Sequence, residues 1–163
     1  MIRVFVFCIG ASSLFAHGFA QQPGAEFKLT IAAHEMTATS GRVGPLTVKE
    51  KNTSAHIISA NRSVDQATWY RVFIVRNGEP VAKTKEMLHR EVQSKHIEAM
   101  IVDPFFLTLK PKQEIELSFP VSAFYEMTEP GRYEVTLARK GTEDVLVRSN
   151  TITITVRLAD ALP

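Results

Sequence analysis

Residues 107–156 constrain the fold of this chain more than any other segment. Short extended runs at 107–110, 114–118, 134–139 and 149–156 alternate with turn residues such as Pro111 and Gly131. Tyr133 follows that glycine by two residues and opens the penultimate run. Two-sheet sandwiches place a tyrosine there, with its hydroxyl bonded back to the preceding loop. We therefore expect Tyr133 to be buried and bonded within 122–131.

The rest of the chain repeats this pattern of short strands. Residues 27–31 and 46–50 alternate apolar and polar side chains, and 67–75 are rich in β-branched and aromatic residues. Asn77-Gly78 then predicts a tight hairpin. Together these runs predict an all-β, immunoglobulin-like two-sheet antiparallel β-sandwich of about 7–8 strands. The expected inward positions are Tyr70, Val72, Ile74, Tyr133, Val135, Leu137, Ile152, Ile154 and Val156, with Ala138 pointing outward.

Residues 83–96 fit this pattern least well. Met87, Leu88 and Val92 are separated by charged residues, so the segment is compatible with a short helix or a polar edge strand. Inside a sandwich we favour an edge strand or an excursion loop. We also expect the segment to be the least ordered part of the domain, and either a contact surface or an edge whose charges discourage aggregation.

Residues 1–20 have the layout of a signal peptide. Arg3 precedes an apolar run from Val4 to Phe15 that is too short to span a bilayer, and Gly18 and Ala20 suit cleavage before Gln21. Residues 21–163 are then expected to form one exported domain, periplasmic or extracellular. The single cysteine is removed with the signal, and the absence of a disulfide points to a bacterial exported protein.

The balance of charge argues against several partners. The chain has 19 Lys and Arg against 17 Asp and Glu, and the basic residues alternate with acids instead of clustering. This pattern is unlike that of a nucleic-acid binder. We also expect no membrane span in the mature chain.

No spacing in the sequence indicates a catalytic, cofactor-binding or metal site. The mature histidines are dispersed, and the His-Met pairs 34/36 and 87/89 are the only close ones. Serines lie in expected turns, as do the two sequon asparagines, and no nucleophile elbow is present. The histidines are His34, His56, His89 and His96, and the two asparagines are Asn52 and Asn61.

Several of these segments together resemble small exported immunoglobulin-like proteins of bacteria. The segments are 48–54 with its Asn52-Thr-Ser54 turn, the strand and turn at 73–81, and the run from Leu107 to Val156. A more distant resemblance is to the BsuPI-type proteinase inhibitors, which share the Asn-Thr-Ser turn and a late Pro-Gly-x-Tyr. This chain has Pro111-Lys112 where that pattern has Pro-Gly, and it carries an export signal that those intracellular inhibitors lack. The resemblance implies a sandwich and places no inhibitory residue.

We expect a non-enzymatic interaction domain that binds a protein or a cell-envelope component through loops or an edge strand. The alternative is a metal-binding or enzymatic protein with a scattered site. A pocket shared by Met87, His89 and an acid would favour that alternative. Protease inhibition through an exposed loop is a third possibility.

Cleavage of the expected signal is directly testable. N-terminal sequencing of the exported protein should begin at or near Gln21, because the small residues at 18 and 20 satisfy the cleavage site. An intact Met1 in a soluble cytoplasmic fraction would contradict the assignment.

Overall fold

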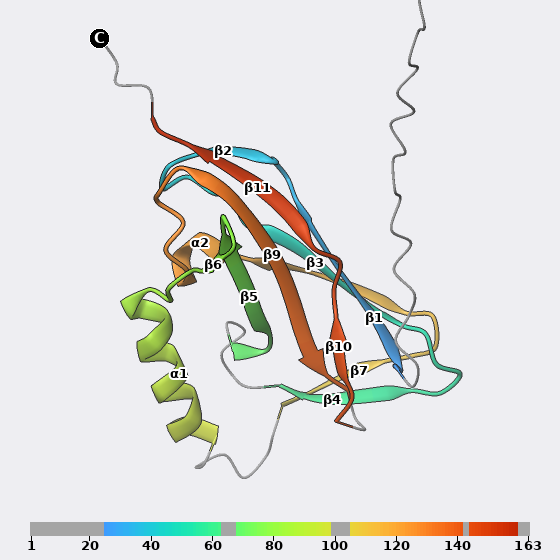
Figure 1. Ribbon diagram of the computed structural model, residues 1–163. Helices are drawn as coiled ribbons and strands as arrows, with labels where there is room; N and C mark the ends of the chain where they lie inside the picture. The colour runs from blue at the N-terminus through green and yellow to red at the C-terminus, as the bar shows by residue number, and fades with distance from the viewer. Residues whose placement is uncertain (1–24, 63–67, 99–104, 142–143, 160–163) are drawn as a thin grey trace, which may run out of the picture.

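A computed structural model describes residues 25–62, 68–98, 105–141 and 144–159 of the chain. The described part is mostly β-structure in antiparallel sheets, with one longer helix at its side (Figure 1). The expected signal peptide lies outside the described residues.

Five of the strands form two smaller sheets, one of three strands and one of two. Strand β3 (Leu46–Asn52) lies between β1 (Phe27–Ala33) and β8 (Glu114–Phe119) and pairs with both in antiparallel register. Beyond a corner, β4 (Ile58–Arg62) pairs with β7 (Phe105–Leu109). Because β4 follows β3 and β7 precedes β8, this two-stranded sheet continues the same two chain segments beyond the corner.

The larger sheet contains six strands. Its order is β2 (Thr37–Thr39), β11 (Ile152–Arg157), β9 (Gly131–Lys140), β5 (Arg71–Arg76) and β6 (Glu79–Pro80), and β10 (Leu146–Arg148) also pairs with β9. All pairs are antiparallel except β2 with β11, which is parallel. The strand β9 is therefore central, with β5 on one side and β11 and β10 on the other (Figure 1).

Inward side chains from both groups of strands form one hydrophobic core. The positions predicted to point inward on β9 and β11 are buried, as are Tyr70 and Ile74, while Val72 packs partly buried against them. Tyr133 is fully buried, and its hydroxyl donates to the Glu129 carbonyl at 2.7 Å. The predicted tyrosine corner is confirmed.

A buried ion pair crosses this core, and the sequence patterns did not reveal it. Glu50 of β3 is 0% exposed and pairs with Arg139 of β9, which is 7% exposed. The Tyr70 hydroxyl donates to the other Glu50 oxygen at 2.7 Å, and the Arg139 guanidinium lies 4.5 Å from the centre of the Phe27 ring. The carboxylate and the guanidinium are therefore both partnered within the interior.

Two turns show how backbone conformation follows residue type. Asn77 and Gly78 both have positive φ, 51° and 92°, as the predicted hairpin between β5 and β6 requires. Lys112 has φ 65° in the turn between β7 and β8. This is the position where the resemblance has glycine, so the chain keeps the turn but places a lysine in a left-handed conformation.

The favoured prediction for residues 83–96, an edge strand or an excursion loop, was wrong, and the alternative of a helix is correct. Residues 85–96 belong to α1 (Lys85–Glu98), a helix that lies between β6 and β7 in the chain and at the side of the sheets (Figure 1). A second helix, α2 (Val121–Phe124), forms the corner between β8 and β9. Among the described side chains of α1, only Met87 and Ser94 are buried. The sequence of the helix therefore lacks the regular spacing of apolar residues that would have identified it. Its expected disorder stays a prediction.

The architecture also differs from the expected two sheets of 7–8 strands, since the described residues contain 11 strands in three sheets. Two chain segments each form two strands in place of one long strand. The first is divided into β3 and β4 at the Asn52 corner, and the second into β7 and β8 at the Pro111 turn. Very short edge strands, β2 and β6, add two more. Asn61 lies in β4 and not in a turn, which corrects the second sequon assignment.

The tyrosine corner generates a stability prediction. Replacing Tyr133 with phenylalanine removes one buried hydrogen bond and keeps the ring, so the free energy of unfolding should fall by about 1 kcal/mol. Urea denaturation checks this value. A Tyr133→Phe variant with the wild-type midpoint and slope would show that the hydroxyl contributes nothing to the corner.

Candidate functional site

Helix α1 begins at a well-formed N-cap that sequence reasoning missed. The Thr84 hydroxyl accepts a hydrogen bond from the Met87 amide at 3.2 Å, and its carbonyl accepts the first helical bond from Leu88. The Thr84 amide in turn donates to the Phe124 carbonyl. The cap therefore starts the helix and also ties it to α2. Thr84 followed by Glu86 in the first turn was the available sequence signal.

The inner side of α1 is anchored by a few specific contacts. Met87 is 2% exposed and belongs to the core, and the Ser94 hydroxyl lies 3.3 Å from that of Thr68. The Arg90 guanidinium lies over the Phe124 ring. These contacts fix which side of the helix faces the sheets.

A polar contact also connects the start of α1 to the α2 corner. Lys83 pairs with Glu91 at 2.5 Å, and Lys83 forms a backbone bridge with Tyr125. Burial raises the pKa of the Tyr125 hydroxyl to about 12, and the negative charge of Glu91 adds to the effect. Tyr125 therefore remains neutral at physiological pH.

The outer side of α1 presents two large apolar side chains to solvent. Leu88 is 51% exposed and Val92 is 70% exposed. They are four residues apart, so they lie on the same side of the helix one turn from each other. Exposed Lys85, His89 and His96 share this outer side. We call Lys85, Leu88, His89, Val92 and His96 the outer face of α1.

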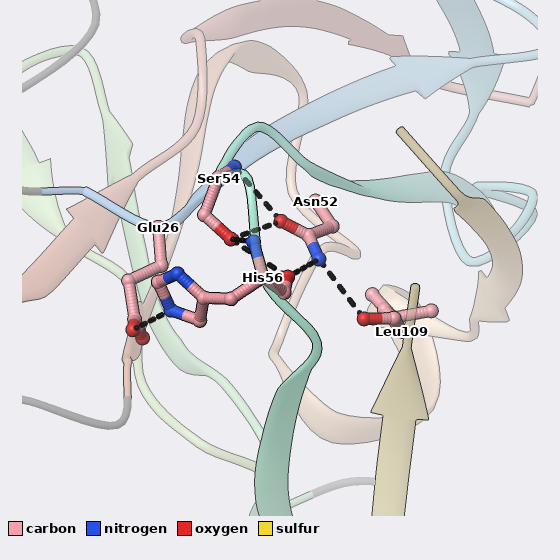
Figure 2. A network of polar contacts seen from close by, with 5 residues as sticks. All are labelled: Glu26, Asn52, Ser54, His56 and Leu109. Carbon is pink, nitrogen blue, oxygen red and sulfur yellow. Dashed lines mark hydrogen bonds and ion pairs between the residues drawn. The ribbon is translucent and has the colours of Figure 1, made fainter. Parts of the chain in front are cut away.

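A second rigid feature is the corner where β3 passes into β4, shown in Figure 2. The fully buried Asn52 uses its whole side chain there. Its oxygen accepts from the Ser54 amide at 2.8 Å, and its nitrogen donates to the carbonyls of His56 (2.8 Å) and Leu109 (2.9 Å). The first sequon is therefore a turn, as predicted, and its amide nitrogen is committed inside the fold.

Ser54, His56 and Glu26 lie together at this corner but do not form a nucleophilic arrangement. The His56 ring points toward Glu26, with Nε2 3.1 Å from the carboxylate, while the Ser54 hydroxyl bonds to the Asn52 oxygen (Figure 2). A nucleophilic serine needs a hydrogen bond to the histidine ring itself. The corner is therefore best described as a structural turn with a surface His-Glu pair.

The other residues considered for chemistry are separated in the structure. Met87 is buried on the inner side of α1 and His89 is exposed on the outer face, so they share no pocket. His34 and Met36 are both exposed between β1 and β2. Over the described ranges, no three His, Cys, Asp or Glu side chains are grouped to hold a metal ion.

Among the hollows formed by the described residues, two are open to solvent and have no histidine in their lining. One of about 570 Å³ lies beside β2 and is lined by Glu35, Arg42 and Arg157 among others. The other, of about 320 Å³, lies beside β6 near the Arg76–Glu129 ion pair. Both are lined mainly by polar and charged side chains. They do not have the apolar character typical of small-molecule pockets.

Comparison with protein-family models finds no match for this chain, and comparison with curated proteins finds none either. Within the described residues, no helix is both long and apolar enough to cross a membrane. The choice of a candidate functional surface therefore depends on the structure alone. The outer face of α1 is the candidate, because two large apolar side chains are exposed there.

Proposed function

We propose that this chain is an exported, non-enzymatic immunoglobulin-like domain that binds a protein or a cell-envelope component through the outer face of α1. The observation that carries the proposal is the exposure of Leu88 and Val92 on a helix anchored by its opposite side. An exposed apolar pair on a fixed helix is typical of surfaces that dock into a groove of a partner. Of the two roles expected for residues 83–96, a contact surface and an edge strand, the proposal takes the first and assigns it to helix α1.

The immunoglobulin-like assignment is supported by strand order and by the tyrosine corner. In such a fold β3 and β9 would correspond to the strands joined by the disulfide of antibody domains, and Tyr133 stands at the start of the second. Val135 occupies the place of the second cysteine and is fully buried. The Glu50–Arg139 pair joins the same two strands. Trp69, partly buried against the core just before β5, fits the tryptophan of the intervening strand.

The outer side of the β1-β3-β8 sheet offers a useful contrast. Lys49 lies 3.1 Å from Glu116 and 3.9 Å from Glu114, and the hydrogen bond to Glu116 is the main cause that raises the lysine pKa. Lys28 and Lys51 complete an exposed polar surface. Charges that pair with one another in solvent are typical of a solvated face. This surface therefore serves as the negative control for binding.

The proposal is tested by site-specific photo-crosslinking in the cells that export the protein. A photoreactive amino acid at Leu88 should yield one discrete crosslinked product, because the side chain would lie inside the interface. The same amino acid at Lys51, on the solvated face, should yield none. The charged double variant Leu88→Asp/Val92→Asp should abolish binding of the captured partner and leave the circular dichroism melt unchanged, since both side chains are exposed.

Two results would contradict the proposed surface. Equal crosslinking at positions 88 and 51 would show that α1 is not a preferred contact. Retained binding by the double aspartate variant would show that the partner uses another face. A product with twice the mass of the chain would identify the partner as a second copy.

A further inference from the structure

The hollow of about 570 Å³ lies where β2 runs parallel to β11 (Figure 1). Val156 of β11 and its partner Ala38 of β2 are buried, so the alternate positions of both strands point to the outer side of the sheet. Thr39 and Arg157 are register partners at these outward positions. A threonine hydroxyl and a guanidinium group therefore come from neighbouring positions of the two strands, and both residues line the hollow.

A tight turn after β2 brings a second arginine to the same place. The Arg42 amide donates to the Thr39 carbonyl at 2.8 Å, and Gly41 has a positive φ of 71° inside this turn. This conformation favours glycine over residues with a side chain. The Ser40 amide donates to the Arg157 carbonyl at 2.8 Å, which ties the turn to β11. Arg42 and Arg157 are therefore both held close to Thr39, and both line the hollow.

The chain is also anchored just beyond this turn. Val43 is buried in the core, and its carbonyl accepts a hydrogen bond from the Ser122 hydroxyl of α2 at 2.7 Å. The turn is thus fixed at one end by β11 and at the other by the core and α2. Backbone groups held in this way position Arg42 before any ligand arrives, which lowers the entropy cost of binding.

The charged residues of the hollow lie at opposite ends of β2. Arg42 and Arg157 come together at the end of the strand, whereas Glu35 precedes its start. All three are exposed, and none of them forms an ion pair within the part of the chain that the structure describes. Two guanidinium groups at one end favour a carboxylate there. The acid at the other end disfavours a second negative charge and can accept a hydrogen bond.

The lining between these ends suits a ligand that carries hydroxyl groups. Thr37 and Thr39 both line the hollow from β2, and a threonine hydroxyl can donate and accept a hydrogen bond. Leu158, which is 70% exposed, adds an apolar side chain to the lining. A sugar ring has hydroxyl groups around its rim and C–H groups on its faces. The lining therefore matches a sugar that also carries a carboxylate.

We propose that this hollow binds a uronic acid residue of an acidic polysaccharide. Arg42 and Arg157 hold the carboxylate by charge-assisted hydrogen bonds, and the ring hydroxyls bond to Thr37 and Thr39. Glu35 accepts a hydrogen bond from a hydroxyl at the far end of the ligand. The site lies beside β2 and not on α1, so it does not rest on the proposed function.

The probe is trigalacturonate, titrated into the full domain by isothermal calorimetry, with maltotriose as the uncharged trisaccharide control. Binding should require the carboxylates, and Arg42→Ala and Arg157→Ala should each weaken it by about tenfold or more. Arg157→Lys should weaken binding comparably, because lysine keeps the charge but loses the planar donor geometry. Thr39→Val should weaken it by about fivefold, since it removes one hydroxyl and keeps the shape of the side chain.

The matched control is Arg71→Ala, which removes an exposed arginine from β5, a strand that β9 separates from β11. It should leave the dissociation constant within about a factor of two, as expected for a distant, screened charge. Equal weakening by Arg71→Ala and Arg42→Ala would overturn the proposal, because the attraction would then be diffuse. Absence of binding at millimolar trigalacturonate would also overturn it. Arg42 and Arg157 are exposed, so their alanine variants should melt like the wild type.

Two further ligands separate a uronate from other anions. A triglutamate peptide carries side-chain carboxylates without ring hydroxyls and should bind at least about tenfold more weakly than trigalacturonate. Equal affinity with the same dependence on Arg42 would assign the site to an acidic protein segment and overturn the proposal. Inorganic phosphate in about tenfold excess should leave trigalacturonate bound, because Glu35 disfavours a second negative charge. Displacement by phosphate would likewise overturn it.

A last comparison keeps this proposal separate from the one for α1. Arg42→Ala should leave photo-crosslinking at Leu88 unchanged, because the two residues belong to different surfaces of the domain. Either proposal can therefore fail without the other.

Discussion

The buried pair between Glu50 and Arg139 is the interaction on which the rest of this structure depends. It places opposite charges from β3 and β9 inside the core, where an unpaired charge would be strongly destabilising. Tyr70 and Phe27 complete the environment by a hydrogen bond and a ring contact. A shift of one sheet relative to the other would separate these groups. The pair therefore specifies how the β1-β3-β8 sheet aligns with the six-stranded sheet. In antibody domains a disulfide joins the sheets instead, and the expected mature chain has no cysteine.

With the sheets fixed in this way, the surfaces of the domain differ in character. The β1-β3-β8 side is polar, and the positive charge of Lys49 is balanced by ion pairs with Glu114 and Glu116. The outer face of α1 combines an apolar pair with basic and histidine side chains, and the side around Ala138 combines arginine with an exposed ring. The proposed function places recognition on side chains held by an anchored helix. Such pre-organisation lowers the entropy cost of binding.

Local signals in the sequence predicted the parts of the fold that depend on local chemistry. Asn77-Gly78 and the position of Tyr133 after Gly131 specify a turn and a corner by residue type, and strict alternation identified most inward side chains. A helix at α1 was only the less favoured alternative, because its anchoring comes from Met87 and from contacts with α2 and not from a periodic apolar face. Arg139 interrupts an apolar pattern, and its burial is explained by contacts far away in the sequence, above all with Glu50, 89 residues earlier. Arg71 and Arg148 both pair with Ala138 of β9, from opposite sides, and this strand register could likewise not be predicted from the sequence.

A double-mutant cycle on the buried pair tests the central claim most directly. Glu50→Gln keeps an acceptor for Tyr70, and Arg139→Met keeps an apolar stem over Phe27. Each single variant should lower the free energy of unfolding by about 3 kcal/mol or more, because it leaves one buried charge without its partner. The double variant should lose clearly less than the two singles together. Removing the exposed Lys49–Glu116 pair should cost less than about 1 kcal/mol. Small, additive losses at Glu50 and Arg139, similar to those of the surface pair, would contradict the account.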